Sequence, residues 1–390
     1  MQVNILHLAP DEKFILFFSE VFGQLEGVEN RYLVQADQHA RFTHVDGLDV
    51  WRVVGRQYFS SPEIAEDLAW ADCLIVHYLD VNGARMILKA PPDVATVWSG
   101  WGGDYYYLMP GGERVLYGNE TRQLIDNLQV PRKTVLERLW TLARRIKYRA
   151  LEKFVVMPAL HHISYFSAPI KSDFVLLQQA LGHQFGAEYI QLNYGSVEKT
   201  FLAGGDRCHG DNILIGNSAT PTNNHLEIFK LLAIQNLAER KLIVPLSYGM
   251  PEYRDAIVEI GGASFGDRFV PICDYMPLPE YNKLISQCSV VIMNHRRQQA
   301  LGNIGAMLFR GAKIFLDEGG PAYAFFKERG AYVYATSLLA NCDESLFAPL
   351  NEEQILVNRT ILETIWGHDV VMKNAQDFVS RIERSMVQRA

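Results

Sequence analysis

Each kind of residue or signal that this sequence lacks excludes a class of protein. Its five cysteines are scattered over 390 residues without a CxxC pair, which argues against a disulfide framework or a zinc site and fits a reducing cytoplasm. No apolar run reaches the ~18 residues of a membrane span. The start, MQVNILHLAP, lacks the basic and cleavage regions of a signal peptide. The composition and length are instead typical of a soluble globular protein with two domains.

Common nucleotide signatures are also missing. No GxGxxG follows the first expected strand, and no GxxxxGK[ST] occurs, so dinucleotide redox chemistry and P-loop chemistry lack their motifs. No DxD-like metal motif stands out, and we expect neither a metal nor another cofactor. The net charge of −7 argues against a general nucleic-acid binder.

One segment is strongly basic although the chain is acidic. Residues 131–154, PRKTVLERLWTLARRIKYRALEKF, hold eight Lys or Arg and two Glu, a net charge of +6, so that the remainder sums to −13. Large apolar side chains lie among these charges, a composition suited to a helix at an anionic membrane surface. A solvated basic face whose apolar side packs on its own domain explains the pattern equally well.

Expected strands and helices alternate along the chain. Strands such as VNILHLA and DCLIVHYL alternate with amphipathic helices in the first half, and the pattern restarts at NILIGNS. This alternation predicts an α/β protein with parallel sheets covered by helices. The polar, Gly-rich stretch 195–212 is typical of a linker. We expect two Rossmann-like domains that face each other, at 1–205 and 206–360, and C-terminal helices at 361–390 that pack back on the first domain.

The turn in ILIGNSATPTNNHLEIFKLL is the first candidate phosphate site. Gly216, Asn217 and Ser218 follow an apolar strand, and a helix is expected over 223–238. Glycine lets the backbone approach a ligand closely, and the start of a helix favours an anion such as a phosphate. An ordinary capped turn is the alternative, because Asn and Ser are good helix caps.

A second turn, NHRRQQALGNIGAML, follows another apolar strand. Arg296 and Arg297 lie next to Gln299, and a helix start at Gly302 and Asn303 comes shortly after them. Paired arginines beside a glycine-containing helix start favour a diphosphate. A solvated loop is the alternative.

Two further strand ends complete the expected donor site. Tyr275 and Met276, in ICDYMPLPEY, are placed to frame a flat nucleotide base by stacking and backbone hydrogen bonds, although a plain turn explains them equally well. VPLSYG ends another strand with Ser247 and Tyr248, which we add to the donor-binding residues.

The first half carries a glycine- and aromatic-rich strand end, VWSGWGGDYYYL. Aromatic faces bind sugar rings, and Asp104 in such a loop is a candidate to accept the proton of an attacking hydroxyl. A helix-capping aspartate is the alternative. His77, His161 and His162 are candidates to line the same cleft, and each alone is more often a structural residue.

Taken together and in this order, several motifs resemble one known family. They resemble the enterobacterial 4-acetamido-4,6-dideoxygalactose (Fuc4NAc) transferase family, most strongly between residues 210 and 335. The motifs that carry the resemblance are WGGDYYYL, ILIGNS…NNH, VPLSYG…Y and YNKLISQCSVVI…RRQQALGNIGAML…GAKIFL. The resemblance implies the GT-B glycosyltransferase architecture of two facing Rossmann-like domains, with the donor bound mainly by the second. It also implies a metal-independent enzyme, peripheral to the cytoplasmic face of the inner membrane.

The resemblance further implies the substrates. A Fuc4NAc-like amino-deoxy sugar would pass from a TDP-sugar, or alternatively a UDP-sugar, to a polyprenyl-diphosphate-linked saccharide in cell-surface polysaccharide synthesis, as for enterobacterial common antigen. In this hypothesis Arg296 and Arg297 offset the charge on the leaving diphosphate, and Asp104 is the base if the reaction inverts the anomeric centre. Two alternatives remain: a sugar epimerase or pyruvyl transferase on the same scaffold, and a non-catalytic nucleotide-sugar-binding protein.

Overall fold

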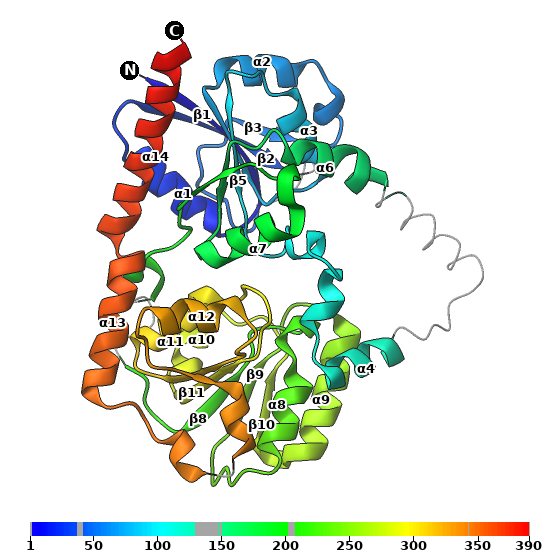
Figure 1. Cartoon of the computed structure of the whole chain (residues 1–390). Coiled ribbons are helices and arrows are strands. Elements are labelled where there is room, and N and C mark those ends of the chain that lie inside the picture. Colours follow the sequence, from blue (N-terminus) through cyan, green and yellow to red (C-terminus); the bar gives the residue numbers. More distant parts are fainter. Residues whose placement is uncertain are drawn as a thin grey trace, which may run out of the picture. The chain divides into compact units, whose positions relative to one another are not determined.

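The computed structural model describes residues 2–36, 42–128, 147, 150–201, 207–341 and 343–389. The chain divides into two compact units (Figure 1). The first unit comprises residues 1–110, 132–195 and 369–390, and the second comprises 111–131 and 196–368. Each unit is built on its own parallel sheet.

The sheet of the first unit has seven strands in the order β3-β2-β1-β4-β5-β6-β7. All neighbours are parallel. Its central strands are mostly apolar and buried along their whole length, as is typical of strands with helices on both faces. The strands are β1 (Val3–Pro10), β2 (Val28–Gln35), β3 (Arg52–Val54), β4 (Cys73–His77), β5 (Ala95–Ser99), β6 (Tyr165–Ser167) and β7 (Glu188–Ile190).

Helices from both ends of the chain cover one face of this sheet. Val21 and Phe22 of the first helix share a buried cluster with Val371 and Phe378 of the last (Figure 1). The C-terminal tail therefore belongs to the core of the first unit. Its helices are α1 (Phe14–Gly23), α2 (Glu63–Trp70), α3 (Val81–Lys89), α6 (Met157–Leu160), α7 (Lys171–Leu181) and α14 (His368–Arg389).

The second unit repeats the same arrangement with six parallel strands in the order β10-β9-β8-β11-β12-β13. The direction of chain progression reverses between β8 and β11, and open parallel sheets bind ligands beyond the carboxyl ends of the strands at such a point. The strands are β8 (Asn212–Ile215), β9 (Leu242–Pro245), β10 (Phe269–Ile272), β11 (Cys288–Met293), β12 (Lys313–Leu316) and β13 (Val333–Ala335).

The helices of the second unit include one whose sequence precedes the linker. Ile125 of α4 (Asn119–Leu128) lies in the same buried cluster as Ile228 of α8 (His225–Leu232) and Ile257 of α9 (Pro251–Phe265). Figure 1 shows α8 and α9 side by side. The remaining helices are α10 (Leu278–Ile285), α11 (Leu301–Phe309), α12 (Pro321–Glu328) and α13 (Glu352–Trp366).

Two sequence-based boundaries differ from the structure. The first is the domain division, because the units separate at 195/196 rather than 205/206 and residues 111–131 belong to the second unit. The second is the helix expected over 223–238, which begins at His225 and ends at Leu232. A short 3₁₀ turn over Pro221–Asn223 precedes it, because proline and the left-handed Asn224 (φ 52°) delay the helix start.

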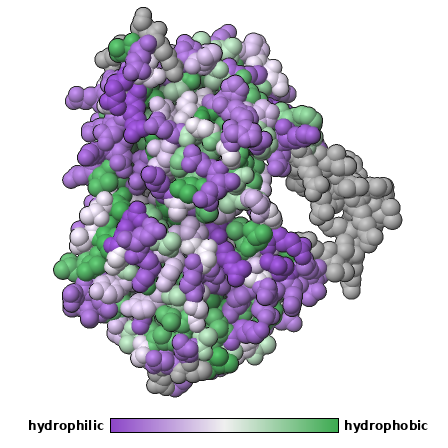
Figure 2. All heavy atoms as spheres, viewed as in Figure 1, coloured by the Kyte–Doolittle hydropathy of each residue, from purple (hydrophilic) through white to green (hydrophobic). Residues whose placement is uncertain are grey.

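The surface view gives no sign of one extended apolar face. Figure 2 shows hydrophilic residues over most of the side in view, with hydrophobic residues in small groups. Among the residues that the structure describes, no helix is both long and apolar enough to cross a membrane.

Candidate functional site

The candidate site of the second unit lies where β8 and β11 end. These two neighbouring strands form the point at which the strand order reverses. Gly216–Ser218 follow β8, and residues 294–299 follow β11. Both turns singled out in the sequence therefore occupy the position at which open parallel sheets bind ligands.

Gly216 holds the first turn in a conformation that is unfavourable for a residue with a side chain. Its φ is +67°, and a Cβ there would lie 2.6 Å from Asn223 Oδ1 and 2.7 Å from His225 Nε2. The backbone N–H of Asn217 donates to Asn223 Oδ1 at 2.9 Å. The turn after β8 is thus fixed against the segment that leads into α8, and its tight backbone suits close approach by a ligand.

A chain of side-chain hydrogen bonds joins three strand ends. Asn217 donates from Nδ2 to the hydroxyl of Tyr248 at 2.7 Å and accepts at Oδ1 from Gln299 Nε2 at 2.9 Å. Gln299 Oε1 in turn accepts from the Thr222 hydroxyl at 2.6 Å and from Arg297 Nε at 2.9 Å. The structure therefore brings three of the predicted donor-binding residues, Asn217, Tyr248 and Gln299, into one network with Arg297, which was predicted to be catalytic.

The two arginines have different surroundings. Arg297 is oriented through Nε, and its two Nη groups make no hydrogen bond with the residues that the structure describes. Arg296 is exposed, pairs with Asp317 after β12 at 3.3 Å, and donates to the backbone oxygen of Tyr117 at 3.3 Å. Arg297 thus presents a positioned fork of donors suited to phosphate oxygens, whereas Arg296 is partly neutralised.

A buried histidine completes the turn after β11. Asn223 Nδ2 donates to Thr220 O at 2.9 Å, so its Oδ1 is the acceptor that lies 2.8 Å from His295 Nε2. Burial, aided by the positive charge of Arg297, lowers the pKa of His295 well below its ordinary value. The neutral ring must therefore carry its hydrogen on Nε2. Its Nδ1 is left as a buried acceptor without a partner among the described residues.

Sequence reasoning did not assign a role to several members of this cluster. Thr222, Asn223 and His225 lie in the polar run TPTNNH, whose density of hydrogen-bonding residues was the available signal. Tyr117 reaches Arg296 from 179 positions away in the sequence, and no local pattern indicates that contact.

Other predicted residues lie outside the network. Tyr275 is 85% exposed after β10, and no hydrogen bond joins it, Met276 or Ser247 to the network within the described part of the chain. Gly302 lies exposed in the first turn of α11, and Asn303 donates to the Tyr281 hydroxyl at 3.4 Å. These residues are on the strand-end side of the unit but are not assembled by the protein's own contacts.

In the first unit, Asp104 does not fit the expected role of a general base. The side chain is 1% exposed. Its carboxylate accepts from Trp98 Nε1 at 2.7 Å, from Trp101 N at 2.9 Å and from Leu79 N at 3.0 Å. Burial raises the pKa of this carboxyl above its ordinary value, although these hydrogen bonds act in the opposite direction. The contacts make Asp104 the residue that ties the Gly100–Gly103 loop to the end of β4.

The aromatic residues of this loop divide into a buried and an open group. Tyr105 and Tyr106 both donate to the buried carboxylate of Asp173. Trp101 lies near the rings of Phe14 and Tyr194, with centroids at 5.2 and 6.4 Å, and is partly exposed. Trp101 forms the open group, and its ring is the part of the loop that remains available to a sugar ring.

The other predicted histidines have separate environments. His77 is fully buried, and its Nε2 lies 3.0 Å from Nδ1 of His7 on the neighbouring strand. His161 and His162 are exposed in the turn after α6. None of the three joins Asp104 through a hydrogen bond among the described residues.

The basic segment 131–154 is described only at residue 147 and from residue 150 onward. Its proposed membrane face, with Trp140, Arg144 and Arg145, lies outside the described residues. Within the described ranges, no three His, Cys, Asp or Glu side chains are grouped closely enough to hold a metal ion.

The two-sheet architecture is similar to that of several solved glycosyltransferases. The chain is similar to an O-GlcNAc transferase from Thermobaculum terrenum (TM-score 0.58, 11% identity, covering 100% of this chain and 69% of that one). It is also similar to a lipopolysaccharide outer core galactosyltransferase (0.58, 9%, 97% and 99%), and to an Anabaena protein in complex with UDP and glucose (0.50, 13%, 99% and 98%). At these identities the likeness establishes the fold, which is GT-B.

A family model gives the finer assignment. Residues 201–336 match the family described as 4-alpha-L-fucosyltransferase, glycosyl transferase group 56. The matched range spans the strand ends of β8, β9 and β11 and both candidate turns. The match assigns residues 201–336 to the 4-alpha-L-fucosyltransferase glycosyltransferase family model, within a chain whose fold is GT-B.

Proposed function

We propose that the protein transfers a Fuc4NAc-like amino-deoxy sugar from a TDP-sugar to a polyprenyl-diphosphate-linked saccharide in cell-surface polysaccharide synthesis. A UDP-sugar is the alternative donor. The observation that carries the proposal is the network of Asn217, Gln299 and Arg297 at the β8–β11 strand ends, inside the segment that matches the family.

In this proposal the donor diphosphate lies between the two turns. The backbone of Gly216, Asn217 and Ser218 approaches it from β8, and the start of α11 at Gly302 and Asn303 approaches it from β11. Backbone N–H groups and a helix start both favour an anion.

Arg297 is the residue proposed to stabilise the leaving group. Its Nε is held by Gln299, while its Nη groups are not used by the described residues, so a phosphate can accept from both without breaking an existing contact. Arg296, which is paired with Asp317, adds positive charge from the neighbouring position in the sequence. Charge that grows on the leaving diphosphate is thereby met by fixed donors, and the proposal requires no metal.

The exposed residues after β9 and β10 are proposed to recognise the nucleoside. Tyr275 and Met276 would frame the base, and Ser247 and Tyr248 would contact the adjoining ribose or diphosphate. Ser247, Tyr248 and Tyr275 are exposed and Met276 is half-buried, which is consistent with contacts that form only when a donor binds. Asp104 is proposed to position the aromatic loop and not to act as the base.

The membrane part of the proposal concerns the basic segment 131–154. It would hold the protein at the cytoplasmic face of the inner membrane, where a polyprenyl-linked acceptor resides. Liposome flotation of the wild type and of a variant with Arg144, Arg145 and Lys147 changed to Glu tests this. Equal flotation of both on anionic lipid would refute docking by this segment.

The transfer reaction is tested by incubating TDP-Fuc4NAc with a polyprenyl-diphosphate-linked saccharide and detecting the extended lipid. Arg297→Gln should lower kcat ~10²–10³-fold, the usual effect of losing one fixed donor to a developing charge. Arg254→Gln, a surface arginine paired with Asp255 on α9, is the matched control. Hydrolysis or epimerisation of the donor without acceptor would instead identify a different nucleotide-sugar enzyme.

A further inference from the structure

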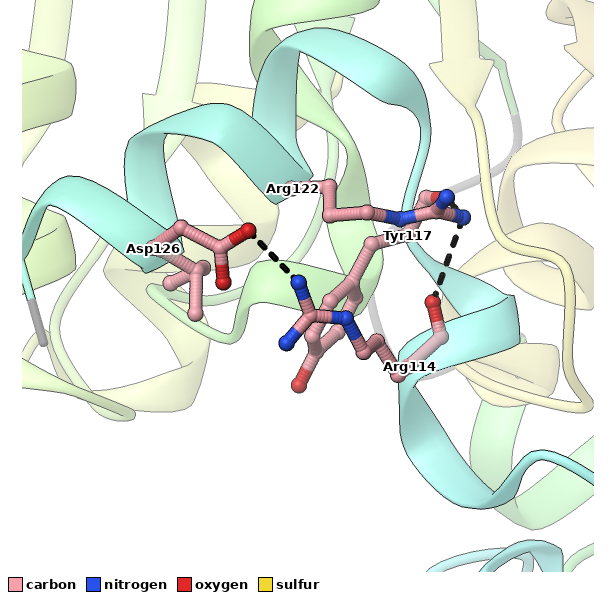
Figure 3. Close-up of a pocket in the computed structure, with 5 residues that line it drawn as sticks. Arg114, Tyr117, Arg122 and Asp126 are labelled. Carbon is pink, nitrogen blue, oxygen red and sulfur yellow. Dashed lines mark hydrogen bonds and ion pairs between the residues drawn. The ribbon is translucent and has the colours of Figure 1, made fainter.

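A small cavity opens beside the donor site within the second unit. It has a volume of about 190 Å³ and is lined by Arg114, Tyr117, Arg122, Ile125 and Asp126. Figure 3 shows that Arg122 and Asp126 extend from α4, while Arg114 and Tyr117 come from the turn before it. The volume exceeds the ~30 Å³ share of one water molecule several times, which is enough for a small polyatomic anion.

The two arginines of this cavity differ in charge balance. Arg114 is paired with Asp126, with 2.6 Å between Nη2 and Oδ2. Arg122 donates from Nη2 to the backbone oxygens of Tyr117 and Arg114, at 3.2 and 3.5 Å. It has no carboxylate partner among the residues that the structure describes. Figure 3 shows both sets of contacts. One of the two positive charges lining the cavity is therefore not neutralised.

Arg122 also has an unused buried donor. Its Nε is shielded from solvent and has no hydrogen-bond partner among the described residues. A buried donor without an acceptor is unfavourable, and an anionic oxygen is the partner that guanidinium groups prefer. The arginine is meanwhile anchored by its two backbone contacts, so the group is already oriented.

Tyr117 connects this cavity to the donor site. Its backbone oxygen accepts from Arg122 on one side and from Arg296 Nη1, at 3.3 Å, on the other. Burial raises the pKa of the Tyr117 hydroxyl, while the positive charge of Arg297 acts to lower it. Through Tyr117 the cavity is thus connected to Arg296, in the turn after β11 that forms one side of the proposed diphosphate site.

We propose that Arg122, with Arg114, forms a second anion subsite that binds a phosphate or diphosphate group while the donor site is occupied. The substrate class is the phosphate ester or diphosphate of a reactant, and the source we favour is the diphosphate of the lipid-linked acceptor. This assignment of the source rests on the proposed function, whereas the subsite itself rests on the cavity and its arginines.

The direct test measures binding of inorganic pyrophosphate to the full-length protein by isothermal titration calorimetry in saturating TDP. Wild type should bind pyrophosphate, and Arg122→Gln should weaken this binding at least ~10-fold, as expected for loss of a charge-assisted hydrogen bond. Asp126→Asn should strengthen it, because Arg114 is then released from its carboxylate. Arg254→Gln serves as the unchanged control.

The two variants are expected to change the pyrophosphate affinity in opposite directions, and misfolding would not produce that pattern. Absence of pyrophosphate binding at saturating TDP, or equal binding by wild type, Arg122→Gln and Asp126→Asn, would overturn the subsite. Failure of TDP itself to bind would contradict the proposed function. The subsite would then be tested by titrating pyrophosphate into the wild type and the two variants without TDP. In the transfer assay, a raised KM of Arg122→Gln for the lipid-linked acceptor assigns the anion to the acceptor, and a raised KM for the TDP-sugar assigns it to the donor.

Discussion

Four buried histidines contribute to the acid sensitivity of the chain. Burial lowers the pKa of His7 to about 4 and that of His225 to about 3, and it lowers the pKa of His77 and His295 well below the ordinary value. Their folded-state pKa lies below the unfolded value of 6.5. The stability that they contribute is therefore complete above pH 6.5 and is lost as the pH falls below it, for His7 and His225 down to their folded-state pKa values of about 4 and about 3.

A substitution at His225 tests this dependence. From pH 7 to pH 5, protonation of this one ring in the unfolded chain should cost on the order of 2 kcal/mol of unfolding free energy. His225→Gln should remove that share of the pH dependence in urea unfolding. His183→Gln, at an exposed position, should leave it unchanged. An identical loss of stability in wild type and His225→Gln would show that His225 does not titrate in this way.

Asp104 provides a second test at the scale of one residue. Asn offers one side-chain oxygen where Asp104 accepts from Trp98, Trp101 and Leu79, and its NH₂ would face a donor. We expect Asp104→Asn to destabilise the first unit by about 1–3 kcal/mol, the usual cost of an unpaired buried polar group. Thermal unfolding monitored by tryptophan fluorescence measures this. Unchanged stability with a ~10²–10⁴-fold loss of turnover would restore the role of Asp104 as base.

At the scale of elements, the turn after β8 is the part of the donor site most sensitive to added volume. Gly216→Ala would place a methyl group within 2.7 Å of Asn223 Oδ1 and His225 Nε2 at a positive φ. Gly266→Ala has a similar φ, +56°, with nothing within 4 Å. TDP affinity should fall in Gly216→Ala and remain unchanged in Gly266→Ala, so that strain alone is excluded as the cause. Equal affinities would mean that the turn does not approach the diphosphate.

The sequence predicted that the strands now seen as β8 and β11 end at the candidate donor site. Each is an apolar run followed directly by polar residues, and such a change marks the end of a strand. The sequence also assigned Asn217 and Arg297 to one diphosphate site, and the carboxyl ends of parallel strands do share one edge of a sheet. It did not predict the start of α8 at His225, where a left-handed Asn224 competes with the helix signal. Nor did it predict Tyr117, because residues 111–131 join the second unit through tertiary packing that no local periodicity records.

At the scale of the whole molecule, the chain returns to complete its first unit. Phe378 of α14 lies within ring contact of Phe22 and Tyr165, with centroids at 6.4 and 5.9 Å. The core of the first unit thus includes residues from the end of the chain, and the buried cluster described for the second unit contains none of them. The two units should respond separately to damage in either core.

Phe378→Ala tests this separation. Removing a buried phenylalanine should destabilise the first unit by about 3–5 kcal/mol, while TDP binding by the second unit stays unchanged. Hydrogen exchange followed by mass spectrometry resolves the two units, and calorimetry measures the TDP affinity. Val387→Ala, at a 62% exposed position of the same helix, is the control. Parallel loss of protection in both units would contradict separate cores.

The measurement that most directly tests the central claim is titration of TDP, UDP, GDP and NAD into the full-length protein and its Arg297→Gln variant by isothermal titration calorimetry. TDP, or alternatively UDP, should bind the wild type at one site. Arg297→Gln should weaken this binding about 10- to 100-fold, the effect of losing a hydrogen bond to a charged group. Binding of NAD alone, or equal TDP affinity in both proteins, would show that the β8–β11 strand ends are not a nucleotide-sugar site.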